Sequence, residues 1–150
     1  MAADAVELDI VVEGESPPPV DPELLADLVV FAWAAAGGTG NPSIAVVLTD
    51  DARLRRLHRD FMGIDQETDV MTFPHGEDSG GDIVISVERA ADQAPDFGHG
   101  TGEEVAFLAV HGVLHLRGWN DDTPADRAAM LARQSDIIGA FRVVRGTDPR

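Results

Sequence analysis

The 150-residue sequence contains no cysteine and no lysine. Without cysteine there are no disulfide bonds and no thiolate metal sites, so any metal ligand must be a histidine or a carboxylate. No run of about 18 consecutive apolar residues occurs, and we therefore expect no membrane-spanning helix. The N-terminus also lacks the positively charged start of a secretory signal, which predicts a cytoplasmic protein.

Positive charge is scarce as well. All 11 basic residues are arginines, against 27 acidic residues, and the net charge is −16. This balance argues against broad, non-specific binding to nucleic acid, because phosphates would be repelled, but it leaves room for a local arginine patch. Hydrophobic residues make up 44% of the chain, enough for a core. The length is that of one ordinary domain, so we expect a single domain over residues 1–150.

Apolar patterning predicts about four strands with helices between them. The strands are expected over residues 6–12, 43–48, 70–73 and 82–87, with Pro74 ending the third. One helix is expected to begin after Asp21 and a second after Thr49 or Asp50. A short helix should follow the fourth strand and end at about residue 94. A fourth helix should open at a capping box over 101–104, and the last should run from 123–126 to about 138. The remaining segments are predicted to be a stiff linker at 13–20, a mobile Gly-rich loop at 75–81 and a loop at 95–100. This layout indicates an α+β fold with a mixed sheet.

The segment from His111 to Asp121 has the spacing of a metal site. His111 and His115 are four residues apart, so on a helix their Cβ atoms lie about 5–6 Å apart on one face. Gly118 can adopt a positive φ and end the helix, after which Asp121 can fold back beneath the same ion. Two nitrogens, one carboxylate and an open fourth position are typical of a catalytic Zn²⁺ site. Asp122 is a rival third ligand, although its offset from Gly118 fits less well.

Two other interpretations of this helix are open. A single histidine on an apolar helix is usually a packed, hydrogen-bonded core residue. The spacing also fits a metzincin-like metalloprotease, but such enzymes carry a glutamate after the first histidine as general base. Here that position is Gly112, so a protease would need a base from elsewhere in the chain.

Three segments together resemble the YbeY family of bacterial rRNA maturation factors and endoribonucleases. Residues 111–118 (HGVLHLRG) are similar to its motif H-G-x-L-H-L-x-G, residues 68–74 (TDVMTFP) to T-D-V-L-S-F-P, and residues 81–86 (GDIVIS) to G-D-I-V-I-S. Their order and spacing also match, over roughly residues 43–138. The resemblance implies a zinc-dependent endoribonuclease that cleaves single-stranded RNA in rRNA precursors. It also implies a place in ribosome quality control and contact with the ribosome or ribosomal proteins.

The sequence departs from the family pattern at two places. The family motif usually continues Y-D-H where this chain has Trp119-Asn120-Asp121, so Asp121 stands in place of a third histidine. The family usually has an arginine, the expected partner of phosphate charge, where Met62 stands. Arg59 lies three residues earlier on the same helix face, and we predict that it replaces this arginine as the catalytic residue.

Loss of the family arginine also leaves a third function open: a ribosome-associated binding factor whose zinc is mainly structural. Other polar and aromatic residues are weaker candidates for function. We expect surface positions for some, structural hydrogen bonds for others, and for Trp119 packing over the metal turn. The surface group is His58, His75 and His99, although His75 could line the cleft, and the hydrogen-bonding group is Asp69 and Asp82.

Overall fold

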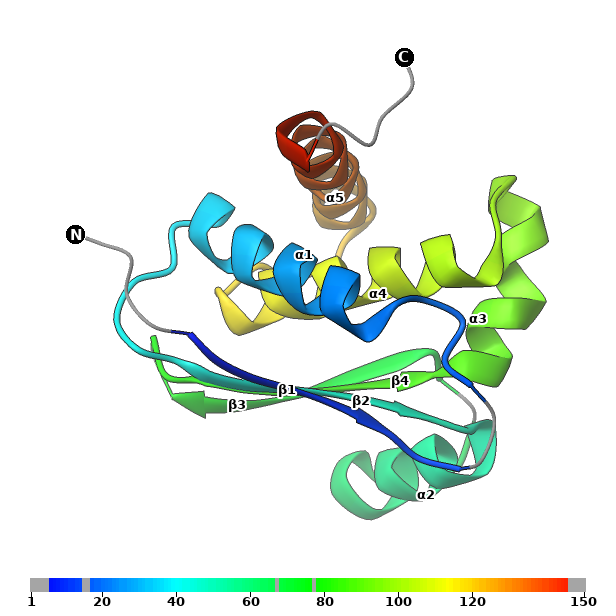
Figure 1. Ribbon diagram of the computed structural model, residues 1–150. Coiled ribbons are helices and arrows are strands. Elements are labelled where there is room, and N and C mark those ends of the chain that lie inside the picture. The colour runs from blue at the N-terminus through cyan, green and yellow to red at the C-terminus, as the bar shows by residue number, and fades with distance from the viewer. Residues whose placement is uncertain (1–5, 15–16, 67, 77, 146–150) are drawn as a thin grey trace.

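The computed structural model describes residues 6–14, 17–66, 68–76 and 78–145 (Figure 1). A four-stranded sheet lies at its centre, with helices on both faces. Its strands are, in spatial order, β1 (Glu7–Val12), β2 (Ser43–Thr49), β4 (Gly80–Ser86) and β3 (Val70–Gly76). The first three are parallel to one another, and β3 runs antiparallel to β4. The predicted mixed sheet in an α+β fold is confirmed.

Five α-helices and one 3₁₀ helix surround the sheet: α1 (Pro22–Ala35), α2 (Asp51–Met62), α3 (Val87–Gln93), η1 (Ala94–Phe97), α4 (Thr101–Leu116) and α5 (Pro124–Arg145). Figure 1 shows α1 and α4 over one face, with α5 packed across them, and α2 on the other face. No helix among the described residues is both long enough and apolar enough to cross a membrane.

The two faces of the sheet support cores of different size. Ile83 and Ile85 of β4 join the main core, which also contains side chains from α1, α4 and α5. Val84, which points to the opposite face, packs with Leu54 and Met71 in a small cluster between the sheet and α2. This alternation follows from the two-residue period of a strand. The helix α4 therefore packs against the sheet along one side, and its opposite side is left to contact α5 and to carry functional side chains.

The third strand is longer than predicted. Pro74 does not end β3, which continues to Gly76, and Pro74 lies opposite Gly81 of β4. Because β3 is an edge strand, the missing N–H of a proline is tolerated there. The predicted mobile loop at 75–81 was therefore wrong at both of its ends, which belong to strands; residue 77 lies outside the described part of the chain.

Helix ends also differ from the predictions in three places. The N-cap of α4 is Gly100, whose N–H donates to Glu103 Oε1 at 2.8 Å, so the capping box begins one residue earlier than expected. The helix α5 continues beyond 138 to Arg145, because Phe141 extends its buried face against Phe31. Residues 95–97, expected as loop, belong to η1. Asp50 caps α2 by accepting from the N–H of Arg53.

Candidate metal centre

The C-terminal end of α4 is shaped by a tight glycine turn. The N–H groups of Gly118 and Trp119 donate to the carbonyls of His115 and Leu114, both at 3.0 Å. This 5→2 and 6→1 pair is the Schellman arrangement, which needs a left-handed residue after the helix. Gly118 supplies it with a φ of 95°. The chain then turns back so that Asp121 comes beneath the two histidines, as the spacing predicted.

The structure brings His111, His115 and Asp121 together. Nε2 of His111 lies 3.0 Å from Nε2 of His115. One carboxylate oxygen of Asp121, Oδ2, lies 3.4 Å from Nε2 of His111 and 3.6 Å from Nε2 of His115. Asp122 is not part of this group; its N–H donates to Asn120 Oδ1 at 3.4 Å instead. The geometry therefore favours Asp121 over its rival.

The remaining nitrogen of each imidazole is held by a protein oxygen. Nδ1 of His115 lies 3.0 Å from the carbonyl oxygen of Trp119. Nδ1 of His111 lies 2.9 Å from Oε1 of Gln134, whose Nε2 donates to the carbonyl of Phe107 at 3.3 Å. Carbonyl and amide oxygens only accept, so both Nδ1 atoms carry the hydrogen. In the neutral rings both Nε2 atoms then present lone pairs toward each other.

Three acceptors that converge in this way are suited to a cation. Two nitrogen lone pairs and a carboxylate oxygen repel one another unless a positive charge lies between them. For a tetrahedral ion with ligands about 2.0–2.1 Å away, ligand atoms are separated by about 3.3 Å. The observed separations of 3.0, 3.4 and 3.6 Å bracket this value. The residues present thus fit a metal ion, and this group is the one such cluster found among the described residues.

Arg117 ties the metal turn to the rest of the fold. Its Nη1 donates to Asp78 Oδ1 at 2.6 Å and its Nη2 to the carbonyl of Gly37 at 3.2 Å. Its guanidinium also lies 4.8 Å from the centre of the Trp33 ring. These contacts join the end of α4 to the β3–β4 turn and to the residues that follow α1.

Comparisons with known proteins agree with this geometry. The family model described as Endoribonuclease YbeY matches residues 23–142. The chain is 43% identical to the endoribonuclease YbeY of Moorella thermoacetica, over 85% of this chain and 92% of that protein. It is 41% identical to that of Symbiobacterium thermophilum, over 75% of this chain and 80% of the relative.

The chain belongs to the endoribonuclease YbeY family. A solved protein of Thermotoga maritima shares the fold, with a TM-score of 0.64 at 24% identity over 95% of this chain and 93% of that one. Relatives in the YbeY family are named endoribonucleases. The resemblance drawn from the three sequence segments is confirmed.

The position after the first histidine is closed to a side chain in this member of the YbeY family. Gly112 is buried against β4, and a Cβ added to it would lie 2.6 Å from Cγ2 of Ile83. A side chain at this position would be directed at Ile83 of the sheet. The glutamate base of a metzincin therefore has no place here, which removes the geometric basis of the metalloprotease interpretation.

Arg59 is not brought to the metal group. It lies on α2, on the opposite face of the sheet from α4 (Figure 1). Its side chain is 50% exposed, and its Nε donates to Asp60 Oδ1 at 3.2 Å. Met62, at the position of the family arginine, ends the same helix and is also exposed. The edge strand β3 lies between, with α4 against one face and α2 against the other.

The weaker candidates separate into surface and structural roles. Nδ1 of His58 lies 3.0 Å from the carbonyl of Gln66 on the surface, and His75 lies 3.6 Å from Asp82. Asp69 accepts a hydrogen bond from Gln93, the structural role expected of it. Trp119 was expected to pack over the metal turn, and it packs against the main core.

Sequence reasoning missed two residues and misplaced a third. His99 is not an exposed loop histidine: its side chain is 22% exposed and its Nε2 lies 2.6 Å from Glu104. The sequence predicts only a capping role for Glu104, yet its side chain is buried. Gln134 carried no signal except its place on the apolar face of α5, where it is also buried.

Proposed function

We propose that this chain is a zinc-dependent endoribonuclease that hydrolyses single-stranded RNA. The observation that carries the proposal is the pair of imidazole Nε2 atoms 3.0 Å apart, completed by a carboxylate, in a chain of the endoribonuclease YbeY family. We further propose that residues 1–150 act as one metal-dependent hydrolase domain. Its place would be the cytoplasm, in the maturation of rRNA precursors and in ribosome quality control, with the ribosome or ribosomal proteins as partners.

The proposed ligands are His111, His115 and Asp121. Zinc suits this set because imidazole nitrogens are poor ligands for Mg²⁺ and Ca²⁺, which prefer oxygen. When bound, zinc supplies Lewis acidity toward a phosphoryl oxygen and activates water near neutral pH. Gln134 and the Trp119 carbonyl hold the two rings so that both Nε2 lone pairs face the ion. Such outer contacts typically change metal affinity or activity about 10–100-fold.

Arg59 is proposed as the group that contacts the substrate phosphate. Its guanidinium is half exposed, and the partner of its Nε is an exposed aspartate, so it can exchange that partner for a phosphate. It would reach the substrate only if the RNA crosses the free edge of β3, because α2 and α4 lie on opposite faces of the sheet. An arginine at this point would offset negative charge that builds up in the transition state.

A binding factor with structural zinc is the competing function. Asp121 supports an open metal site, because its side chain is 37% exposed and so is reachable from solvent. A structural zinc site normally has four protein ligands and is closed to water. Only three ligand side chains converge among the described residues, which favours catalysis over a purely structural ion.

The test is cleavage of labelled RNA by zinc-loaded protein. We expect cleavage of a single-stranded oligonucleotide, little cleavage of the same sequence in a duplex, and loss of activity with a chelator. The His115→Ala variant should be inactive, and the matched surface variant Asp122→Asn should behave as wild type. If zinc-loaded protein leaves RNA intact but co-sediments with ribosomal subunits, the binding-factor function replaces the nuclease.

A further inference from the structure

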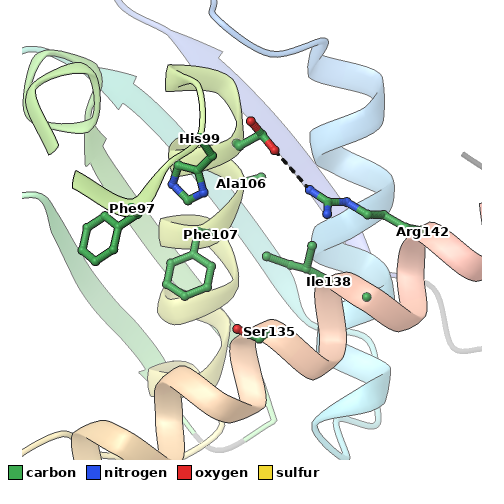
Figure 2. A pocket seen from close by; sticks show the side chains of 9 residues that line it. Phe97, His99, Ala106, Phe107, Ser135, Ile138 and Arg142 are labelled. Atoms are coloured by element: carbon green, nitrogen blue, oxygen red, sulfur yellow. Dashed lines mark ion pairs between the residues drawn. The ribbon is translucent and has the colours of Figure 1, made fainter. Parts of the chain in front are cut away.

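A cavity lies beside the N-terminal half of α4, away from His111, His115 and Asp121. Its volume is about 360 Å³, within the usual range of small-molecule pockets. Figure 2 shows aromatic side chains on one side of it and the residues of α5 on the other. The lining includes Phe97, His99, Phe107, Ser135, Ile138 and Arg142.

Three flat rings form one wall of this cavity. The imidazole of His99 lies between Phe97 and Phe107, with ring centres 6.1 and 6.3 Å away (Figure 2). Phe97 is 62% exposed, although it is among the most hydrophobic side chains. An exposed phenylalanine at the mouth of a pocket leaves an aromatic face free to stack on a planar ligand.

A buried carboxylate holds His99 in place. Glu104 is 1% exposed, its Oε1 lies 2.6 Å from Nε2 of His99, and its Oε2 accepts from Gln93 at 2.6 Å. Burying a carboxylate is costly unless it is paired and hydrogen-bonded. Because an ionised carboxylate only accepts, Nε2 of His99 is the donor. Among the described residues nothing bonds Nδ1 of His99, so this atom is available to a ligand.

The charges around the cavity are already matched. Arg142 lies 3.6 Å from Glu103 (dashed in Figure 2), and His99 is hydrogen-bonded to Glu104. No excess positive charge is left for a phosphate. A neutral, planar ligand with hydrogen-bonding edges suits the site better, because it can stack on the rings and bond to Nδ1 of His99 or the hydroxyl of Ser135. Nucleobases have this chemistry, and proteins read unpaired bases by such contacts.

The cavity is connected to the metal centre through α4 and α5. Phe107 precedes His111 by four residues, so the two lie on one face of the helix. The carbonyl of Phe107 accepts from Gln134, and Gln134 in turn holds His111. Ser135, the next residue on α5, lines the cavity. Phe107, which lines the cavity, is therefore about one helical turn from His111.

We propose that this cavity is a nucleobase-binding pocket, which holds one unpaired base of the RNA while a neighbouring phosphate lies at the metal group. The identity of the ligand rests on the proposed function; the pocket itself does not. Stacking on Phe97 and Phe107 supplies affinity, and hydrogen bonds to Nδ1 of His99 and to the hydroxyl of Ser135 supply preference among bases.

The first test uses neutral nucleosides, which avoid repulsion by the acidic surface. Adenosine, guanosine, cytidine and uridine are each titrated into zinc-loaded, isotope-labelled protein and followed by NMR. At least one should shift the signals of Phe97, His99, Phe107 and Ser135. No shift with any nucleoside overturns the proposal. A larger shift at the same residues with N-acetyl-phenylalanine amide also overturns it, because it would identify an anchor site for a partner protein.

The second test separates the pocket from the metal centre. Phe97→Leu keeps the apolar bulk but removes the ring, and Phe97→Trp keeps a ring. Binding of a labelled single-stranded oligonucleotide should weaken roughly fivefold or more in Phe97→Leu and persist in Phe97→Trp. Val30→Ala, an exposed apolar change on α1, which contributes no residue to this cavity, should leave it unchanged.

The proposed nuclease activity and the proposed base-binding pocket can fail separately in these tests. The His115→Ala variant should lose metal but retain nucleoside shifts at the pocket. If no version cleaves RNA but nucleosides still bind, the nuclease is wrong and the pocket stands. If wild type and Phe97→Leu bind and cleave RNA equally well, the pocket is wrong and the nuclease stands.

Discussion

Nε2 of His111 faces Nε2 of His115 at 3.0 Å, while the other nitrogen of each ring is bonded to a protein oxygen. Two acceptors at this distance are unfavourable unless a cation or a shared proton lies between them. The ring orientations are set from outside the pair, by Gln134 and by the carbonyl of Trp119. The protein therefore maintains a site whose electrostatics call for a positive charge, and a metal ion held by these residues could supply it.

Removal of the Gln134 contact should weaken metal binding without removing a ligand. In Gln134→Ala, Nδ1 of His111 and the carbonyl of Phe107 lose their partner, and the ring is free to turn. We expect zinc affinity to fall about 10–100-fold, measured by competition with a chromophoric chelator. Gln134→Glu, which still accepts from Nδ1, should recover most of it. Equal affinity in all three proteins would show that Gln134 does not position the ring.

A methyl group at residue 112 should destabilise the packing of α4 against the sheet. In Gly112→Ala the new Cβ would lie 2.6 Å from Ile83 Cγ2, so α4 or β4 must shift. Overpacking of this kind typically costs about 1–3 kcal/mol of unfolding free energy. Thermal or urea unfolding measures the loss, and Gly139→Ala on α5, where an added Cβ meets no atom within 4 Å among the described residues, is the control. A Gly112→Ala protein as stable as wild type would contradict the close packing.

Replacement of the aspartate by histidine should change metal preference. Asp121→His exchanges an oxygen ligand for a third imidazole, which suits zinc, whereas carboxylates suit Mn²⁺ and Mg²⁺. We expect the ratio of zinc to manganese affinity to rise, as measured by parallel metal competition titrations. Asp122→His should leave the ratio unchanged. If Asp122→His alters it and Asp121→His does not, the third ligand is Asp122.

Loss of Arg59 on α2 should impair catalysis and leave the metal in place. Arg59→Ala should reduce RNA cleavage about 10²–10³-fold while zinc content stays at the wild-type level. Met62→Arg, one turn further along the helix, should raise wild-type activity and rescue Arg59→Ala. The control is Arg53→Ala, an exposed arginine on the same helix. Unchanged cleavage in Arg59→Ala would remove Arg59 from the mechanism.

The part of the metal centre that could be predicted from sequence is local. His111, His115, Gly118 and Asp121 lie within eleven consecutive residues, and helix periodicity together with the glycine turn determines where each one points. The four strands were likewise predictable, because their apolar runs are continuous or alternate. The sequence alone could not exclude Asp122 as the third ligand, since the conformation after Gly118 decides between the two aspartates.

The parts that were missed depend on tertiary contacts. Gln134 reaches His111 from another helix, 23 residues further along the chain, and its sequence neighbourhood gives no sign of this. Glu104 has the spacing of a helix cap, and only the packing of α3 and α4 shows that it is buried beneath His99. The predicted strand end at Pro74 is wrong because sequence alone does not reveal that β3 lies at the edge of the sheet.

The most direct measurement is a zinc titration of metal-free protein, with cleavage of a labelled single-stranded RNA followed at each step. Our account predicts that cleavage rises with added zinc and stops rising at one equivalent per chain. In the double variant His111→Ala, His115→Ala, we expect no cleavage at any zinc concentration. Full cleavage by metal-free protein, or by the double variant, would contradict a metal-dependent nuclease at this site.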